Sequence, residues 1–280
     1  MWFPSPYPDE LFYSVLCRYY LSSGIKEHYL VKKQLFGTKA GVKMATLYPN
    51  AAVHAVLSQL PEGVFDGRDM ILHHTPFLYY ARMHPQQERE VLLDDLLQGR
   101  SKTPTHLWRT FPKGDYALRY CPLCIQEDTK IYGEAYYHVE HQIPLSSVCV
   151  RHRCRLKQIT IDNPRLALNN KFYPLSTMET DREPDMDVTA AELQVSELVR
   201  EYWRLPASVS PPACNNLYQT LLNSGYRTIV RQTGLNIDRA KLYTALCGYH
   251  EAEVVKKIFG ENISGTMMNR IKTWEQLLPD

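Results

Sequence analysis

The sequence of 280 residues lacks the long apolar runs that membrane proteins need. No stretch approaches the roughly 18 consecutive apolar residues that cross a bilayer as a helix. The start, MWFPSPYPDE, also lacks the basic segment followed by an apolar segment that forms a secretory signal. We therefore expect a cytoplasmic protein with no membrane partner. In that compartment its seven cysteines are expected to be metal ligands or buried thiols before disulfides.

A strong excess of charge is also missing, because the net charge is only +2. The distribution is uneven: residues 1–160 carry 19 Lys and Arg against 15 Asp and Glu, whereas residues 161–280 carry 13 against 15. Much of the acidity lies in ETDREPDMDVTAAE at 179–192, which is either a solvated spacer or a surface for a basic partner. The asymmetry is compatible with nucleic-acid contact but does not require it.

Internal repeats and low-complexity tracts are absent, and the spacing of apolar residues predicts a mainly helical fold. Helices are expected from about Leu11 to Gly24, at 27–36, after an N-cap at Asn50, at 85–99, at 211–225 and over most of the tail from Ile229 to Leu278. Thr189 and Glu192 form a capping box that predicts one more helix ending near Trp203. Residues 106–160 differ, because no long helical period survives among their aromatic residues and cysteines.

Two short motifs in this central region carry metal-ligand spacing. RYCPLC supplies Cys121 and Cys124, and after 24 intervening residues CVRHRC supplies Cys149 and His152. A gap of two residues lets one tight turn present two side chains to one ion, and zinc prefers four such ligands at tetrahedral corners. These four residues are therefore predicted to bind zinc. Four protein ligands leave no position for a reacting water, so we expect a structural ion worth on the order of 10 kcal/mol of folding free energy.

Three neighbouring residues are alternative ligands. Cys154 could replace His152, and His138 or His141 could also compete. We interpret Cys154 as a buried thiol and the two histidines as packing residues or as contacts to the ligands. Zinc deaminases place H-x-E before P-C-x-x-C, whereas here HVE follows the cysteine pair, so the order is wrong for that chemistry. A zinc hydrolase stays a hypothesis that metal-dependent turnover would revive.

Two groups of basic residues are candidate nucleic-acid contacts. The first is Arg151, Arg153, Arg155 and Lys157, which alternate with His152, Cys154 and Leu156. If the chain is extended there, the four cations share one face and either contact DNA phosphates or guard a solvated edge strand. The second group, Lys32, Lys33, Lys39 and Lys43, surrounds the helix end at Gly37. A solvated surface is the alternative for this group as well.

These patterns divide the chain into four parts. We expect a helical N-terminal domain with helix-turn-helix character at 1–105, a zinc-binding module with short β-strands at 106–160, a polar linker at 161–187 and a helical C-terminal domain at 188–280. Residues 240–259 are a candidate helix-turn-helix with Gly248 in the turn. Acidic residues at the start of its second helix favour instead two packed helices without a DNA role.

Three stretches of the chain are similar to one known family. They are FPSPYPDELFYSVLCRY near the start, HHTPFLYY at 73–80, and the central RYCPLC, YGEAYYHVEHQIPLSSVC and Cys149-x2-His152 followed by Leu156. Together they resemble the TniQ family, which includes the TnsD-type target-site selectors of bacterial cut-and-paste transposons. The resemblance covers roughly residues 1–160 and is loose over 186–280. Family members usually carry glycine after the last ligand, so Arg153 argues against a left-handed turn there.

The resemblance implies a non-enzymatic, DNA-binding selector with the same four zinc ligands. Such a protein recognises an attachment site on double-stranded DNA and recruits the AAA+ ATPase TnsC, which in turn brings the transposase. The alternative is an adaptor without DNA specificity that links an RNA-guided CRISPR effector complex to the ATPase. Trp2, Phe3 and Tyr7 on the proline-rich arm then either fold back on the core or dock on the ATPase.

Overall fold

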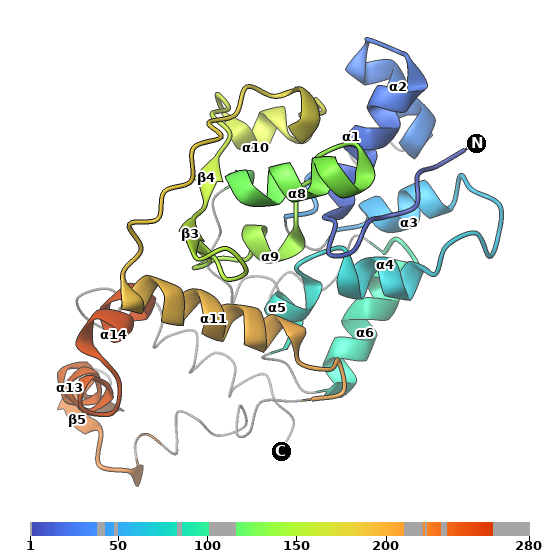
Figure 1. Cartoon of the computed structure of the whole chain (residues 1–280). Coiled ribbons are helices and arrows are strands. Elements are labelled where there is room, and N and C mark those ends of the chain that lie inside the picture. The colour runs from blue at the N-terminus through green and yellow to red at the C-terminus, as the bar shows by residue number, and fades with distance from the viewer. Residues whose placement is uncertain are drawn as a thin grey trace.

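Helices make up most of the chain in the computed structural model, which confirms the mainly helical prediction (Figure 1). The structure describes residues 2–37, 43–47, 50–82, 86–100, 116–209, 221, 223–230 and 234–259. The first group of helices comprises α1 (Phe12–Ser23), α2 (His28–Phe36), α3 (Ala52–Leu57), α4 (Gly67–His73), α5 (Phe77–Ala81) and α6 (Gln86–Leu97). None of the described helices combines the length and the apolar character needed to cross a bilayer.

The first helices begin and end close to the predicted residues. Gly24 adopts the left-handed conformation that ends α1, with φ of 68°, and Gly37 with φ of 61° follows α2. At α3 the N-cap position is Ala51, one residue after the predicted Asn50. The Asn50 side chain still accepts a hydrogen bond from the Ala52 amide, at 2.8 Å, and so supports the first turn.

The central region holds a helix between short strands. Its elements are β1 (Arg119–Tyr120), α8 (Pro122–Tyr132), α9 (Val139–Gln142), β2 (Val148–Cys149), β3 (Cys154–Arg155) and β4 (Lys157–Gln158). β2 and β3 form an antiparallel hairpin in which Cys149 faces Cys154, and β1 pairs with β4. The expectation of no long helix here was wrong for α8. Pro122 at its first turn and Gly133 in a left-handed cap begin and end this helix.

Residues 161–187, predicted as a polar linker, contribute to the core. They contain α10 (Pro164–Ala167) and the short 3₁₀ helix η1 (Leu175–Thr177). Leu168, Phe172 and Leu175 are buried in the same apolar cluster as α1 and the central region. The segment is therefore packed on the protein rather than held away from it, while the predicted domain boundaries stay a prediction.

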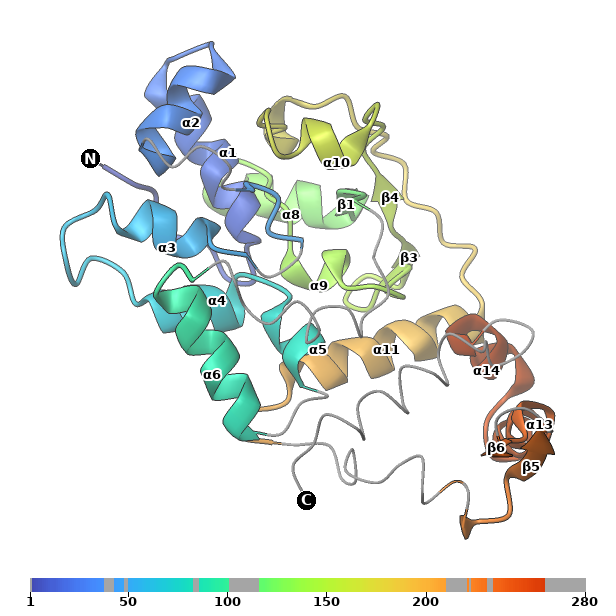
Figure 2. The same ribbon diagram turned by 180° about the vertical axis from the view of Figure 1, so that it is seen from behind.

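The long helix α11 (Ala190–Arg204) lies across one side of the molecule and supports the central hairpin (Figure 2). Both hydrogen bonds of the predicted Thr189–Glu192 capping box are present, which confirms that start. The buried Ser196 hydroxyl accepts the Ser147 and Val148 amides, each at 3.2 Å. At its other end, the buried Arg82 donates to backbone oxygens of residues 203, 205, 206 and 209. Helix α11 is thus tied to both halves of the chain.

The C-terminal part departs from the helical prediction. β5 (Arg227–Val230) and β6 (Gly234–Ile237) form a hairpin where we expected helix, because the β-branched run at 228–230 favours a strand. α13 (Arg239–Tyr249) and α14 (Ala252–Phe259) follow, and α14 packs on α11. Gly248 lies inside α13 and not in the turn, so that part of the helix-turn-helix prediction was wrong. Most of the predicted helix 211–225 and the tail from 260 lie outside the described residues.

Candidate metal centre and basic surfaces

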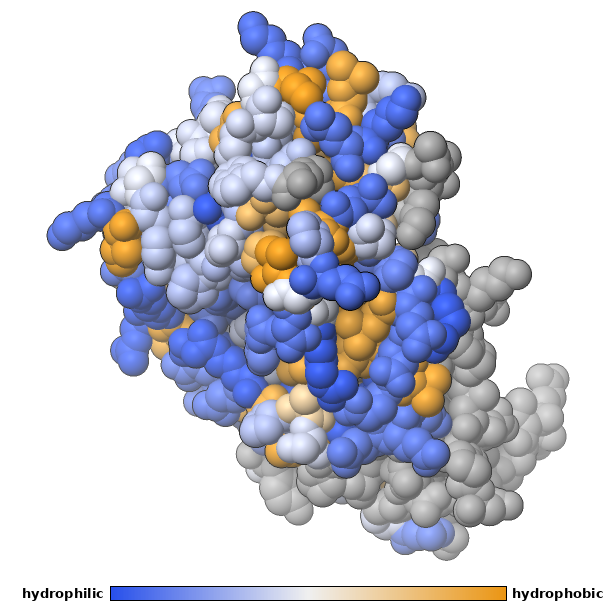
Figure 3. Space-filling model, turned by 90° about the vertical axis from the view of Figure 1, so that its right-hand side faces the viewer, coloured by the Kyte–Doolittle hydropathy of each residue, from blue (hydrophilic) through white to orange (hydrophobic). Residues whose placement is uncertain are grey.

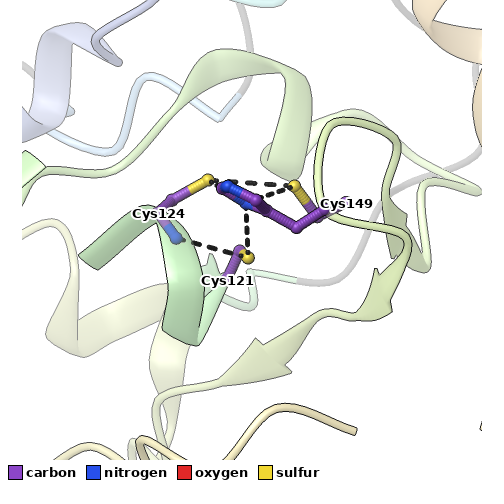
Figure 4. Close-up of side chains that lie close together, drawn as sticks. Cys121, Cys124 and Cys149 are labelled. Atoms are coloured by element: carbon purple, nitrogen blue, oxygen red, sulfur yellow. Dashed lines mark hydrogen bonds between the residues drawn. The ribbon is translucent and has the colours of Figure 1, made fainter. Parts of the chain in front are cut away.

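The four predicted metal ligands come together in the structure. The Sγ atoms of Cys121, Cys124 and Cys149 and one ring nitrogen of His152 all lie within 4.8 Å of one another. Figure 4 shows the three cysteine side chains converging on one point around an imidazole ring. All three thiols are buried, so the cluster is closed to solvent on most sides. The set reached from sequence spacing is therefore one cluster in space.

The distances within the cluster fit a tetrahedral ion. Nδ1 of His152 lies 3.4, 3.3 and 3.6 Å from the sulfurs of Cys121, Cys124 and Cys149. The sulfurs of Cys124 and Cys149 are 3.8 Å apart. A zinc ion with Zn–S bonds of about 2.3 Å and a Zn–N bond of about 2.0–2.1 Å would hold its ligands about 3.5–3.8 Å apart. Hydrogen bonds from Cys124 and Cys149 lower the pKa of Cys121 to about 3, which supplies a thiolate.

Each ligand pair is positioned by a local backbone device. Cys121 is the N-cap of α8, and its sulfur accepts the Cys124 amide at 3.4 Å, so both sulfurs sit at the start of one helix. In the second pair, Cys149 ends β2 and His152 lies in the turn that follows. There Arg153 donates its amide to the Cys149 carbonyl at 2.7 Å and has φ of 52°. The turn is therefore left-handed without glycine, which corrects the expectation drawn from Arg153 and places a strained residue beside the ligand.

Side chains around the cluster orient its histidine. Glu127 lies on α8 one turn after Cys124, and its carboxylate is 3.2 Å from Nε2 of His152. The same carboxylate pairs with Arg151 at 3.0 Å. A carboxylate on the second ring nitrogen fixes which nitrogen faces the ion, as is common at zinc sites. Sequence reasoning missed Glu127, although its position three residues after a ligand on a helix would have indicated it.

The three alternative ligands lie at the edge of the cluster. Nε2 of the buried His141 is 4.0 Å from the Cys124 sulfur, and its ring lies 4.9 Å from that of His138. The sulfur of Cys154 is 3.3 Å from that of Cys121 and has no exposed surface. Burial raises the pKa of Cys154 to about 12, so it stays a thiol that can donate to the Cys121 thiolate. Its position agrees with our interpretation of Cys154 as a buried thiol.

His138 joins the N-terminal arm to the metal module instead. Its ring nitrogens lie 3.0 Å from the Asp128 carboxylate and 3.4 Å from that of Asp9. Burial lowers the pKa of His138, but the hydrogen bonds to Asp128 and Asp9 outweigh it and raise the pKa to about 10. This buried cation between two carboxylates holds residues near the chain start against α8.

The basic residues beside the metal cluster do not form one extended face. Residues 150–153 are a turn, while Arg155 lies on β3 and Lys157 on β4. Arg155 pairs with Asp185 at 3.1 Å and also with Glu192, and Lys157 pairs with Asp181. The acidic segment 181–192 therefore covers these two cations. Much of the segment is still exposed, but Asp181, Asp185 and Glu192 already have cationic partners within the chain.

The second basic group lies around α2 and α10. Lys32 on α2 donates to the Asn169 carbonyl at 2.7 Å, and Lys43 is exposed nearby. Both line one pocket with Arg165 of α10, which sequence reasoning missed. Lys33 is exposed and does not line this pocket, and Lys39 lies outside the described residues. Of the three described lysines of this group, the structure brings Lys32 and Lys43 together and leaves Lys33 outside the pocket.

Of the three aromatic residues of the N-terminal arm, two pack on the protein and one is exposed. Phe3 is buried against the rings of Phe12, Tyr19 and Phe65. Tyr7 stacks on Tyr132 and carries the Arg18 guanidinium over its ring, 3.7 Å from the ring centre; its hydroxyl donates to Glu134. Trp2 has 65% of its surface exposed. Figure 3 shows hydrophobic residues as small patches among hydrophilic ones on the face it presents.

Comparison with known proteins identifies relatives of this chain. The family model described as TniQ matches residues 1–156, a range that ends just after the metal cluster. A curated relative, the transposon Tn7 transposition protein TnsD of Escherichia coli, is 27% identical over 155 residues. The alignment covers 54% of this chain and 30% of that protein. The family match thus includes all four candidate ligands, and the alignment with the relative spans less than a third of that protein.

Proposed function

Because the chain belongs to the TniQ family, we propose that it is a non-enzymatic target-site selector of a bacterial transposon. In this role it binds double-stranded DNA at an attachment site and recruits an AAA+ ATPase of the TnsC type, which brings the transposase. The observation that carries the proposal is the family match over residues 1–156, which contains the whole Cys/His cluster. The relative named as a Tn7 transposition protein supports the same process.

We propose that Cys121, Cys124, Cys149 and His152 bind a structural zinc ion. Three thiolates and one imidazole are the ligands that zinc prefers, and four protein ligands fill a tetrahedral shell. The ion would join α8 to the β2–β3 hairpin and so hold the centre of the adaptor together. No coordination position is left for a substrate, which agrees with a selector that has no catalytic task of its own.

The exposed Trp2 is the arm residue that we propose for contact with the ATPase. Phe3 and Tyr7 already pack on the protein itself, whereas the Trp2 indole has no comparable cover. Large exposed aromatic residues are frequent anchors of protein interfaces. Trp2→Ala should weaken binding of the ATPase while leaving the thermal midpoint of the selector unchanged.

DNA binding and ATPase recruitment are tested on the purified full chain. Selection from a random duplex library, followed by gel-shift titration at several salt concentrations, should yield a preferred duplex. Affinity should fall with salt by about 0.9 powers per phosphate contacted. Adding the ATPase should produce a larger complex on the same duplex. Negligible DNA binding at every salt concentration, together with a stable complex with an RNA-guided effector, would instead support the adaptor without DNA specificity.

A further inference from the structure

An open pocket of about 340 Å³ lies where three separate segments meet: α2, residues 43–47 and α10 with the turn after it. Its polar lining consists of Lys32, Lys43, Arg165 and the amides of Asn163, Asn169 and Asn170. Three of these six side chains are cations. Arg165 is more than a hundred residues away from Lys32 and Lys43 in the sequence, so the pocket exists only in the folded chain.

Asn169 assembles the pocket. Its carbonyl oxygen accepts the Lys32 ammonium at 2.7 Å, and its side-chain oxygen accepts the Ala45 amide at 3.2 Å. Its side-chain nitrogen donates to the Arg165 carbonyl at 2.7 Å. One residue therefore links all three segments, and these hydrogen bonds fix the Lys32 ammonium and the backbone at Ala45 and Arg165.

The charges of this pocket are not neutralised from within the described chain. Among the described residues, no carboxylate forms an ion pair with Lys32, Lys43 or Arg165, whereas Arg155 and Lys157 each have carboxylate partners. Lys32 is only partly exposed, and burial lowers its pKa. Its ammonium group is therefore partly desolvated, and a bound anion would offset that desolvation cost. Positive charges in a concave surface also concentrate their field on the space between them.

We propose that this pocket holds a backbone phosphate of double-stranded DNA. The assignment rests on the proposed function and names the surface through which the selector contacts its target. Among the described residues, no aromatic ring lines the pocket, so this part of the chain offers no platform on which a base could stack. Cations and amides without such a ring suit phosphate oxygens, which fix position along the duplex without reading sequence.

The test compares two double charge reversals in the full chain. Lys43→Glu with Arg165→Glu changes two exposed pocket residues, and Lys130→Glu with Arg182→Glu changes an exposed lysine and arginine elsewhere. Binding of a fluorescein-labelled random duplex of about 30 base pairs is followed by anisotropy from about 50 to 200 mM salt. The pocket variant should bind roughly 10- to 100-fold more weakly, and its salt slope should fall by about 0.9, the value for one lost phosphate contact. The control variant should keep most of the affinity and the slope.

Each other outcome overturns the assignment in a distinguishable way. Failure of the wild-type protein to bind any duplex at low salt removes direct DNA binding, and with it both this pocket and the DNA part of the proposed function. Wild-type binding with equal losses in the two variants removes the pocket alone. Competition by about 10 mM inorganic phosphate at constant ionic strength would indicate a site for a free anion. A selective loss of RNA-duplex binding would assign the pocket to RNA.

Discussion

The two basic surfaces of this protein look alike in sequence and differ in the folded chain. Arg155 and Lys157 beside the metal cluster are covered by the acidic segment 181–192. Lys32 and Lys43 share a pocket with Arg165, and no carboxylate of the described part of the chain pairs with any of the three. Arg155 and Lys157 have carboxylate partners within the chain, whereas the three cations of the pocket have none among the described residues.

This difference shows why the number of cations in a segment is a poor guide to where an anion binds. A cation in an ion pair must first separate from its carboxylate. The lost ion-pair energy then reduces the net free energy of binding a phosphate. An unpaired cation in a pocket has no such competitor, and its field is focused by the surface around it. The basic stretch at 151–157 is the more conspicuous in sequence, yet the structure leaves it the less available.

Removing a metal ligand should have the largest effect, because Arg155 meets its carboxylate partners only while the β2–β3 hairpin is folded. We expect Cys149→Ser to abolish zinc binding and to unfold the central region. A structural zinc contributes on the order of 10 kcal/mol, which is comparable to the whole stability of a domain. Elemental analysis should find one zinc per wild-type chain and none in the variant, and circular dichroism should show a large drop in thermal midpoint.

Cys247→Ser is the matched control for that experiment. Cys247 is only half-buried on α13 and is not among the clustered thiols, so its loss should change neither metal content nor midpoint. Wild-type protein purified without any bound metal and with full stability would contradict the structural zinc. Retention of zinc by Cys149→Ser would show that Cys154 or His141 can serve as the fourth ligand.

Glu192→Gln should have the next largest effect, because the Glu192 carboxylate on α11 links the hairpin strand β3 to α14. It pairs with Arg155 and, at 3.0 Å, with Lys257. Removing the charge of a buried carboxylate with two cationic partners should reduce the free energy of unfolding by about 2–3 kcal/mol at neutral pH. Urea unfolding measures the change, and Glu201→Gln at an exposed position of the same helix should have no effect.

The pH dependence of this effect has a defined sign. Burial raises the pKa of Glu192, but hydrogen bonds from Arg155, Thr189 and Lys257 outweigh it and lower the pKa to about 2. A carboxylate with a lowered pKa stabilises the fold above its unfolded value of about 4.5 and loses that contribution as pH falls toward 2. The difference between wild type and Glu192→Gln should therefore shrink in acid. A difference that stays constant from pH 7 to pH 3 would contradict the ion pairs.

Local signals were enough to predict part of this molecule. The ends of α1 and α2, the start of α11 and the four clustered ligands all follow from residues close together in sequence. Helix caps and the Cys-x2-Cys and Cys-x2-His turns depend on contacts over a few residues. Their patterns can therefore be recognised in the sequence without knowing the fold. Helix α8 was missed because its apolar spacing is short and interrupted, and the β5–β6 hairpin because its glycine was taken as a break between helices.

Contacts between distant segments could not be predicted in this way. Arg165 joins Lys32 and Lys43 only through the fold, and the pairing of Arg155 with Asp185 depends on how residues 161–187 return across the central region. Ion-pair partners of this kind leave no spacing pattern in one sequence. The sequence could therefore indicate where cations are numerous but not which of them are already neutralised.

The smallest expected effect tests whether removing acidic partners makes Arg155 and Lys157 more available to DNA. Asp181→Asn with Asp185→Asn removes carboxylates that pair with Lys157 and Arg155, and both are largely exposed, so stability should change by less than about 1 kcal/mol. DNA affinity should rise roughly 3- to 10-fold at low salt, because Lys157 becomes available to a phosphate while Arg155 keeps its pair with Glu192, and the salt slope should steepen by about 0.9. Anisotropy titration with the same labelled duplex measures both.

The matched control separates exposure of these cations from a change in overall charge. Glu62→Gln with Glu179→Gln removes two exposed negative charges that form no ion pair with the basic residues at 151–157 within the part of the chain described here. An equal gain in both double variants would mean that only net charge matters, since a long-range field does not depend on which carboxylate is lost. A gain confined to Asp181→Asn with Asp185→Asn would make the covered surface a second DNA contact, held in reserve by the protein's own acidic segment.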